Sequence, residues 1–187
     1  MSQQFITIDP ALGATGYTVW GVVKTGKHAL LESGEIKSKT KGFDRYWDLP
    51  QKMIEIAQKH KCSMAVIEDY AVSKFDPIPM ISIGHSYRLY LQLHDIPWTV
   101  IHPSTLKIFA TGSGKGDKAM IMKEVYKRWY FEGTNNECDA YTMGKFVLCA
   151  LGAVEGMPQT HTRSIDKWVK DGPERWKLIS KWGEMLL

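Results

Sequence analysis

Cysteine is scarce in this 187-residue sequence, and long apolar runs are absent from it. Cys62, Cys138 and Cys149 form no CxxC pair, so we expect neither a disulfide framework nor a structural zinc site, and a reducing compartment fits best. The six histidines form no HxxxH or HExxH pair, which disfavours catalytic zinc. No apolar run approaches the roughly 18 residues that a membrane span needs. The chain enters its first predicted strand almost at once, so we expect no targeting segment and no membrane attachment.

A nucleotide-binding P-loop is also missing. The glycine-rich stretch at residues 111–116 lacks the G-x-x-x-x-G-K-[ST] spacing, and no strand immediately precedes it, so we expect no nucleotide cofactor. Backbone amides of this stretch, together with Ser113 and either Lys115 or Lys118, could instead approach a phosphate at a helix N-terminus. The alternative is an ordinary surface loop.

Positive charge is present in modest excess and is concentrated in one segment. The chain has 24 Lys and Arg residues against 20 Asp and Glu residues, a formal net charge of +4. Residues 101–130 hold six basic and two acidic residues, a difference of +4 that equals the net charge of the whole chain. Residues 37–41 add three lysines. Such clustering favours contact with a phosphate backbone, although any single lysine is better explained by a solvated helix face.

Hydrophobic periodicity predicts one α/β domain with a mixed sheet. Alternating residues predict three consecutive antiparallel strands at 5–9, 17–23 and 28–36, followed by buried strands at 64–67 and 98–101. Helices are predicted at 43–60, 77–93, 103–109, 118–129 and 137–154, with residues 133–135 as a linker. Pro50 implies that the first helix starts there or is kinked, and Asp117 is a predicted N-cap.

Three acidic residues lie where predicted elements end or begin. Asp9 ends the first strand, Glu68 ends the strand at 64–67, and Asp139 lies near the start of the last apolar helix. Carboxylates brought together in this way are suited to hard cations such as Mg²⁺, and two such ions about 4 Å apart can promote phosphodiester hydrolysis. The alternative is that a strand often ends in an acid because the chain leaves the core there.

Four motifs in order resemble the RuvC family of Holliday-junction resolvases, from about residue 5 to residue 155. The motifs are Ile8-Asp9-Pro10 with Thr15-Gly16-Tyr17, then Val66-Ile67-Glu68, then Thr111-Gly112-Ser113-Gly114-Lys115 with Lys118, and finally Asp139-Ala140 opening an apolar helix. The resemblance implies an RNase H-like fold, in which a five-stranded mixed sheet of three antiparallel strands and then parallel strands is flanked by helices.

The resemblance also implies an activity. Members of the family are homodimers that make paired nicks in four-way and other branched DNA junctions, with Mg²⁺ or Mn²⁺ and two ions per active site. By position, Asp9, Glu68 and Asp139 would be catalytic metal ligands, and Lys107 and Lys118 would lie near the scissile phosphate, Lys118 with a catalytic role. The expected location is the cytoplasm of a bacterium or of a phage-infected host.

Three positions depart from the family pattern. Ala11 replaces the glycine of the first motif, and Arg88 stands where the dimer-forming helix tends to have a small residue. Asn136 stands where the family has a fourth acid, three residues before Asp139. Asn136 could bind a cation through its neutral oxygen, Glu137 could reach in instead, or Asn136 could be a substitution that disables the enzyme.

Residues just after Glu68 are further DNA-binding candidates. Tyr70 and Phe75 lie in a loop that also contains Lys74. In the family, a residue near this position is thought to insert at the junction centre, where unstacking bases costs free energy that other contacts must offset. It is at least as plausible for Tyr70 and Phe75 that each ring simply covers the edge of the core.

Two parts of the chain are predicted: a resolvase domain at residues 1–157, and a C-terminal helical extension at 158–187 that packs on it. Gly172-Pro173 divides the extension into two short helices, whose order must come from docking their tryptophans. The extension is either a stabilising cap or a contact to a DNA arm or the dimer. The main alternative function is a non-catalytic branched-DNA binding protein of the same fold, because an RNase H-like ATPase would need a second domain.

Overall fold

The computed structural model describes residues 2–70, 78–115 and 117–184. Its sheet has the strand order β3-β2-β1-β4-β5. The strands are β1 (Gln3–Asp9), β2 (Thr15–Val22), β3 (His28–Ile36), β4 (Met64–Glu68) and β5 (Trp98–Ile101). The first three strands pair antiparallel, and β4 and β5 continue the sheet parallel to β1. The predicted α/β fold with a five-stranded mixed sheet is confirmed.

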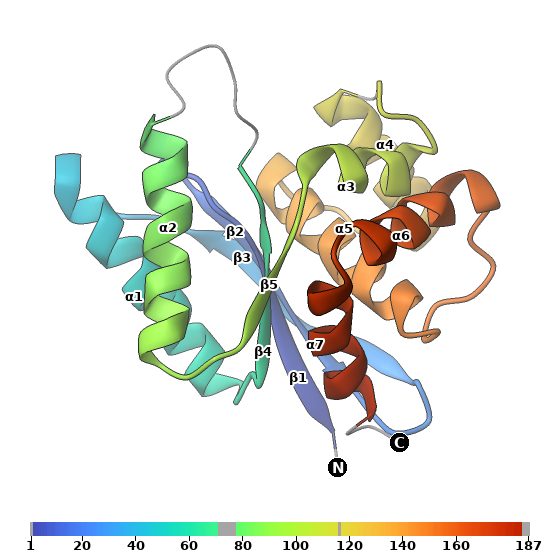
Figure 1. The fold of residues 1–187 in the computed structure, drawn as a ribbon. Helices are drawn as coiled ribbons and strands as arrows, with labels where there is room; N and C mark the ends of the chain where they lie inside the picture. Colours follow the sequence, from blue (N-terminus) through green and yellow to red (C-terminus); the bar gives the residue numbers. More distant parts are fainter. Residues whose placement is uncertain (1, 71–77, 116, 185–187) are drawn as a thin grey trace.

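Helices cover both faces of the sheet (Figure 1). On one face lie α1 (Arg45–Lys59), which follows a short 3₁₀ turn (Gly42–Asp44), and α2 (Ile78–Leu93). The other side carries α3 (Pro103–Thr111), α4 (Lys118–Trp129), α5 (Asn135–Ala150), α6 (Gln159–Asp171) and α7 (Pro173–Glu184). None of the described helices is long and apolar enough to cross a membrane.

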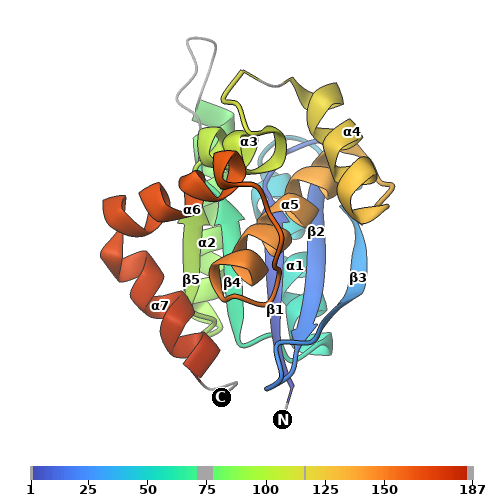
Figure 2. The ribbon, with the colours of Figure 1, turned by 90° about the vertical axis from the view of Figure 1, so that its right-hand side faces the viewer.

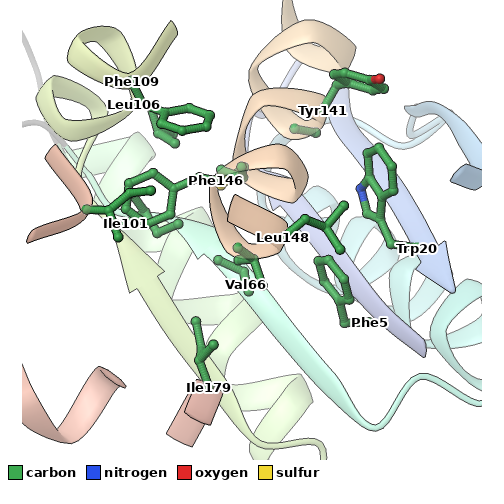
Figure 3. Packing of buried hydrophobic residues seen from close by; sticks show 14 of the residues in the cluster. Phe5, Trp20, Val66, Ile101, Leu106, Phe109, Tyr141, Phe146, Leu148 and Ile179 are labelled. Atoms are coloured by element: carbon green, nitrogen blue, oxygen red, sulfur yellow. The ribbon is translucent and has the colours of Figure 1, made fainter. Parts of the chain in front are cut away.

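Alternation along β1 decides which side chains meet which helices. Successive side chains of a strand point to opposite faces. Ile6 and Ile8 therefore pack in the core beneath α1 and α2, whereas Phe5 packs in the core on the α5 side. Figure 3 shows this second core, in which Phe146 of α5 lies between strand residues such as Val66 and the side chains of α3.

The two C-terminal helices join the core on the α5 side. Trp182 of α7 packs edge-to-face on Phe5, with ring centroids 5.4 Å apart, and Trp168 of α6 packs on Phe146 in the same manner at 5.6 Å. The indole N–H of Trp168 also donates to the carbonyl of Val100 at 3.0 Å. The helix break predicted at residues 172–173 is confirmed, since α6 ends at Asp171 and α7 begins at Pro173.

For α1, one of the two predicted alternatives is excluded; the start of α5 differs from its prediction, and the start of α4 agrees. Helix α1 begins at Arg45 and runs through Pro50, so it does not start at the proline. Helix α5 begins at Asn135, two residues earlier than expected, because the Thr134 side chain accepts from Glu137 N–H and the Glu137 carboxylate reaches back to the Thr134 N–H. The predicted N-cap of α4 is confirmed, with Asp117 accepting from Met120 N–H at 2.8 Å.

Candidate active site

Asp9 and Glu68 are brought together by the parallel pairing of β1 with β4. The register pairs Ile8 with Ile67, so the next residue of each strand lies at the same carboxyl edge of the sheet. Both carboxylates also take the same face, because Asp9 has the parity of Phe5 and Glu68 has the parity of Val66, which point toward α5. The sheet therefore presents two acids to the start of α5.

Helix α5 adds Asp139, and its position over the sheet is fixed by close backbone contacts. The Thr7 hydroxyl donates to the carbonyl of Ala140 at 2.7 Å. Gly16 allows the first turn of α5 to approach β2, since a Cβ there would lie only 2.1 Å from the Asn136 carbonyl oxygen. This contact explains why the chain needs a glycine at position 16, and it holds Asp139 beside the two strand ends.

The three acids line one pocket together with two lysines. The pocket has a volume of about 330 Å³, and Lys107 of α3 and Lys118 of α4 also contribute to its wall. The structure thus brings Asp9, Glu68, Asp139, Lys107 and Lys118 into one site, although these residues come from five different elements.

Burial dominates the electrostatics of the three carboxyls. It raises the pKa of Asp9, an effect opposed by a hydrogen bond from Glu68 and by the Lys118 ammonium. It raises the pKa of Glu68 well above the usual range, and the negative charges of Asp9 and Asp139 add to the effect. Burial, with the charge of Asp9, raises the pKa of Asp139 to about 7 against the opposing lysines. The site therefore holds more negative charge than it can stabilise without a cation or protons.

The chemistry of this site fits a hard divalent cation, but its geometry is not already that of a ligand cage. Buried carboxylates are the donors that Mg²⁺ and Mn²⁺ prefer. In the described part of the chain, however, no three His, Cys, Asp or Glu side chains are grouped closely enough to hold a metal ion as they stand. Asp9 and Glu68 instead share a hydrogen bond. A bound cation would take the place of the proton that this pair shares.

Asn136 and Glu137, the two candidates for a fourth ligand, take different positions. Asn136 lines the pocket, while its Nδ2 donates to the carbonyl of Ala14 at 2.6 Å and to Oε1 of Glu35 at 3.4 Å. The Glu137 carboxylate accepts from Thr134 N–H at 3.0 Å and is not among the residues of the pocket wall.

Tyr70 lies in the pocket wall and is held there by α2. Its hydroxyl accepts from Arg88 at 2.7 Å, and the same guanidinium donates to Asp69 at 2.7 Å and lies 4.5 Å from the Tyr70 ring centroid. Gly84 makes room for the ring, since a Cβ there would lie 3.1 Å from it. Arg88 therefore binds the segment after Glu68 within its own chain. Lys74 and Phe75 lie outside the described residues.

Ser113 and Lys115 lie in the loop between α3 and α4 and do not line the pocket. The Ser113 carbonyl accepts from the Thr111 hydroxyl at 2.7 Å, and the Ser113 hydroxyl accepts from Lys115 N–H at 3.3 Å. Lys115 is exposed, so its ammonium is available to an incoming phosphate.

Sequence reasoning missed the residues that fix the turn after Asp9. The Thr15 hydroxyl donates to the carbonyl of Ala11 at 2.9 Å and accepts from Ala11 N–H at 3.1 Å and from the Tyr87 hydroxyl at 2.9 Å. Thr15 belongs to the first motif and could have been found there. Tyr87 carries no such signal, because its partner is 72 positions away.

Comparisons with known proteins give a clear result for the fold and none at the level of sequence. No family model matches the chain, and no curated protein matches it. At the level of fold, the chain resembles solved structures of Holliday junction resolvases, and it has a RuvC-like fold.

Three of these structures illustrate the likeness. Thermus thermophilus RuvC in complex with a Holliday junction substrate aligns with a TM-score of 0.61 at 16% identity, over 75% of this chain and 89% of RuvC. Fowlpox virus resolvase, in complex with Holliday junction DNA, aligns with a TM-score of 0.51 at 7% identity, over 80% of this chain and 99% of the resolvase. Yeast mitochondrial Holliday junction resolvase Ydc2 aligns at 0.51 and 10% identity, over 99% of this chain and 86% of Ydc2.

Proposed function

We propose that this protein is a divalent-metal-dependent endonuclease that resolves four-way and other branched DNA junctions by paired phosphodiester hydrolysis. The observation that carries the proposal is the pocket in which three carboxylates, one buried and two half-buried, meet two lysines. Such a site combines donors for a hard cation with cationic groups for a phosphate. Structural neighbours that are themselves junction resolvases support the same conclusion.

Asp9, Glu68 and Asp139 would hold Mg²⁺ or Mn²⁺, with two ions per active site. The bound ions would supply Lewis-acid stabilisation of the phosphate and a water of lowered pKa. Asn136 offers only its neutral carbonyl oxygen, because its amide N–H groups already serve Ala14 and Glu35. We leave Glu137 out of the proposed ligand set, since its carboxylate serves the N-terminus of α5.

The two lysines have a binding and orienting role in this proposal. Lys118 lowers the pKa of Asp9 and, with Lys107, opposes the raised pKa of Asp139, so both ammonium groups lie close enough to act on the acids. A phosphodiester entering the pocket would meet these cations beside the carboxylates. Lys115 and Ser113 would contact the phosphate backbone farther along the DNA strand. Tyr70 would face the DNA from the pocket wall.

Two opposed nicks require two active sites, and a two-fold dimer is the simplest way to supply them. The exposed side of α2 carries three large apolar side chains, Ile78, Leu89 and Leu93, which are 57–69% exposed. Trp47 of the neighbouring α1 is 69% exposed. We place the proposed dimer contact on this α1–α2 surface.

Cleavage of a synthetic four-way junction, with and without Mg²⁺, tests the proposal. Asp9→Asn and Glu68→Gln should abolish cleavage and leave junction binding intact or stronger, because each removes both ligand charge and repulsion against phosphate. Asp95→Asn is the matched control, since this exposed turn residue has a left-handed φ of 54° that asparagine also tolerates. Binding without cleavage in either Mg²⁺ or Mn²⁺ would make the protein a non-catalytic junction binder.

The lysines give a second, independent experiment. Lys107→Ala and Lys118→Ala should reduce turnover more than junction affinity, because these residues lie in the pocket with the acids. Lys123→Ala and Lys127→Ala, on the exposed side of α4, should lower the salt dependence of binding by roughly one unit per phosphate contact with less effect on turnover. Equal losses of affinity and rate at all four positions would indicate a general basic surface instead.

A further inference from the structure

Helix α6, part of the C-terminal extension, lies along α3, and both views of the fold place the two helices side by side (Figures 1 and 2). This arrangement matters because α3 carries Lys107 and leads through the loop at residues 112–117 to Lys118. The last four carbonyls of a helix have no partner within the helix and must find one elsewhere. At the end of α3, side chains of α6 supply hydrogen-bond donors to some of these carbonyls.

His161 of α6 joins three helices through one buried ring. Its Nδ1 lies 2.7 Å from the carbonyl oxygen of Phe109, near the end of α3. A carbonyl can only accept, so Nδ1 carries a proton. Nε2 lies 3.4 Å from Nη2 of Arg128 in α4, which can donate to it. His161 is only 7% exposed, so its role is inside the fold rather than on the surface that a nucleic acid would contact.

The same helix fixes the residue at which the loop leaves α3. Gly112 has a left-handed φ of 73°, and its N–H donates to the carbonyl of Ile108. A Cβ on Gly112 would lie 3.1 Å from Nε2 of His161, so α6 packs directly against the loop backbone. The guanidinium of Arg163 donates to the Gly112 carbonyl at 3.0 Å.

Hydrogen bonds also fix the loop residues that follow Gly112, up to Lys115. The Thr111 hydroxyl bonds to both the N–H and the carbonyl of Ser113, and the Ser113 hydroxyl accepts from Lys115 N–H. We infer that His161 and Arg163 are positioning residues, which hold the end of α3 and the loop so that Lys107, Lys115 and Lys118 face the phosphate backbone. The inference rests on the proposed function for its DNA component, while the loop geometry stands independently.

Two substitutions separate the two bonds of the His161 ring, and a third tests Arg163. His161→Asn keeps an N–H near the position of Nδ1 and loses the acceptor toward Arg128, whereas His161→Ala loses both partners. Arg163→Ala removes one contact to the loop. Ser63→Ala is the matched control, because Ser63 accepts a 2.9 Å hydrogen bond from Trp182 of α7 and lies outside the pocket wall. It weakens the docking of the extension without touching the loop.

Hydrogen exchange of the amides at residues 112–115, measured on the protein alone, is the first readout. His161→Ala and Arg163→Ala should speed this exchange by roughly threefold to tenfold, the change expected for one lost hydrogen bond, and Ser63→Ala should not. His161→Asn should retain most of the protection. If His161→Ala does not fold, Arg163→Ala gives the same measurement, with His161→Asn as the variant that should keep the protection.

Binding to a synthetic four-way junction is the second readout. His161→Ala should reduce the slope of log affinity against log salt by roughly one unit or more, as loop lysines lose phosphate contacts, and Ser63→Ala should leave it unchanged. Equal thermal destabilisation by His161→Ala and Ser63→Ala, with unchanged exchange and slope, would reduce α6 to a stabilising cap. Weaker binding by Arg163→Ala with unchanged exchange would make Arg163 a direct DNA contact. Either result overturns the inference, and failure of the wild-type protein to cleave junctions affects only the proposed function.

Discussion

Replacing Asn136 by aspartate tests whether position 136 is a missing fourth acid or a donor that the fold requires. Nδ2 of Asn136 donates to the Ala14 carbonyl at 2.6 Å and to Glu35 at 3.4 Å. In Asn136→Asp an oxygen takes the place of this nitrogen, so both acceptors lose their donor. The first turn of α5 cannot move away freely, because its backbone is packed directly on Gly16.

The expected cost follows from these two contacts. Leaving the Ala14 carbonyl without its partner costs about 1–3 kcal/mol. Repulsion between the new carboxylate and Glu35 adds about 1 kcal/mol, a water-like value, because Glu35 is paired with the exposed Lys37 at 2.9 Å. We therefore expect Asn136→Asp to lower the free energy of unfolding by about 2–4 kcal/mol, which corresponds to a fall of roughly 4–16 °C in Tm.

Urea denaturation at pH 7, with the midpoint compared at constant m-value, measures this cost. Asn135→Asp is the matched control: the same chemical change at the preceding, exposed position should be neutral or slightly stabilising at a helix N-terminus. Adding Glu35→Gln to Asn136→Asp should restore the part of the unfolding free energy that is lost to repulsion. The part lost with the hydrogen bond to the Ala14 carbonyl should remain. A variant Asn136→Asp that is as stable as the wild type and cleaves junctions faster would refute this reasoning and identify position 136 as a ligand position.

Three further predictions concern the fold and the assembly. Hydrogen bonds from Lys59 and other partners lower the pKa of Glu32 to about 2, so its stabilisation is complete above about pH 4.5 and is lost as pH falls toward 2. Glu32→Gln should cost about 1–2 kcal/mol at pH 7 and remove that pH dependence in urea titrations, whereas an unchanged profile contradicts the assignment. Gly16→Ala places a methyl 2.1 Å from the backbone of α5 and should cost about 3 kcal/mol or more in thermal unfolding, whereas Gly13→Ala, with no atom within 4 Å, should not. Leu89→Glu should sediment as a monomer under conditions in which the wild type sediments as a dimer. If the variant and the wild type have the same sedimentation coefficient, the dimer contact lies elsewhere on the protein.

Much of the site could be predicted because its positions depend on local patterns. Alternation in β1 places Asp9 on the same face as Phe5, and the short apolar run of β4 ends in Glu68 at the same edge. The cap at Asp117, which starts the helix that carries Lys118, is likewise a local signal. The alternation of a strand, the residue that ends it and a helix cap each depend on residues that are neighbours in the sequence. These features can therefore be predicted from a single sequence.

One local signal was available and was not used. Thr134 and Glu137 have the spacing of a capping box, in which the carboxylate serves the backbone N–H of the cap residue. Reading that pattern would have started α5 at residue 135 and given the Glu137 carboxylate a partner other than a metal ion.

The remaining interactions depend on tertiary packing. Arg88 could be read only as a bulky residue on a helix, yet it binds Asp69 and Tyr70 because the fold brings α2 beside the segment that follows β4. The bond from Asn136 to Ala14 spans 122 positions, and that from His161 to Phe109 spans 52 positions. Such pairs form only when the angle and depth at which a helix packs on the sheet or on another helix bring two side chains within about 3 Å, and that geometry is set by the whole core rather than by any local pattern.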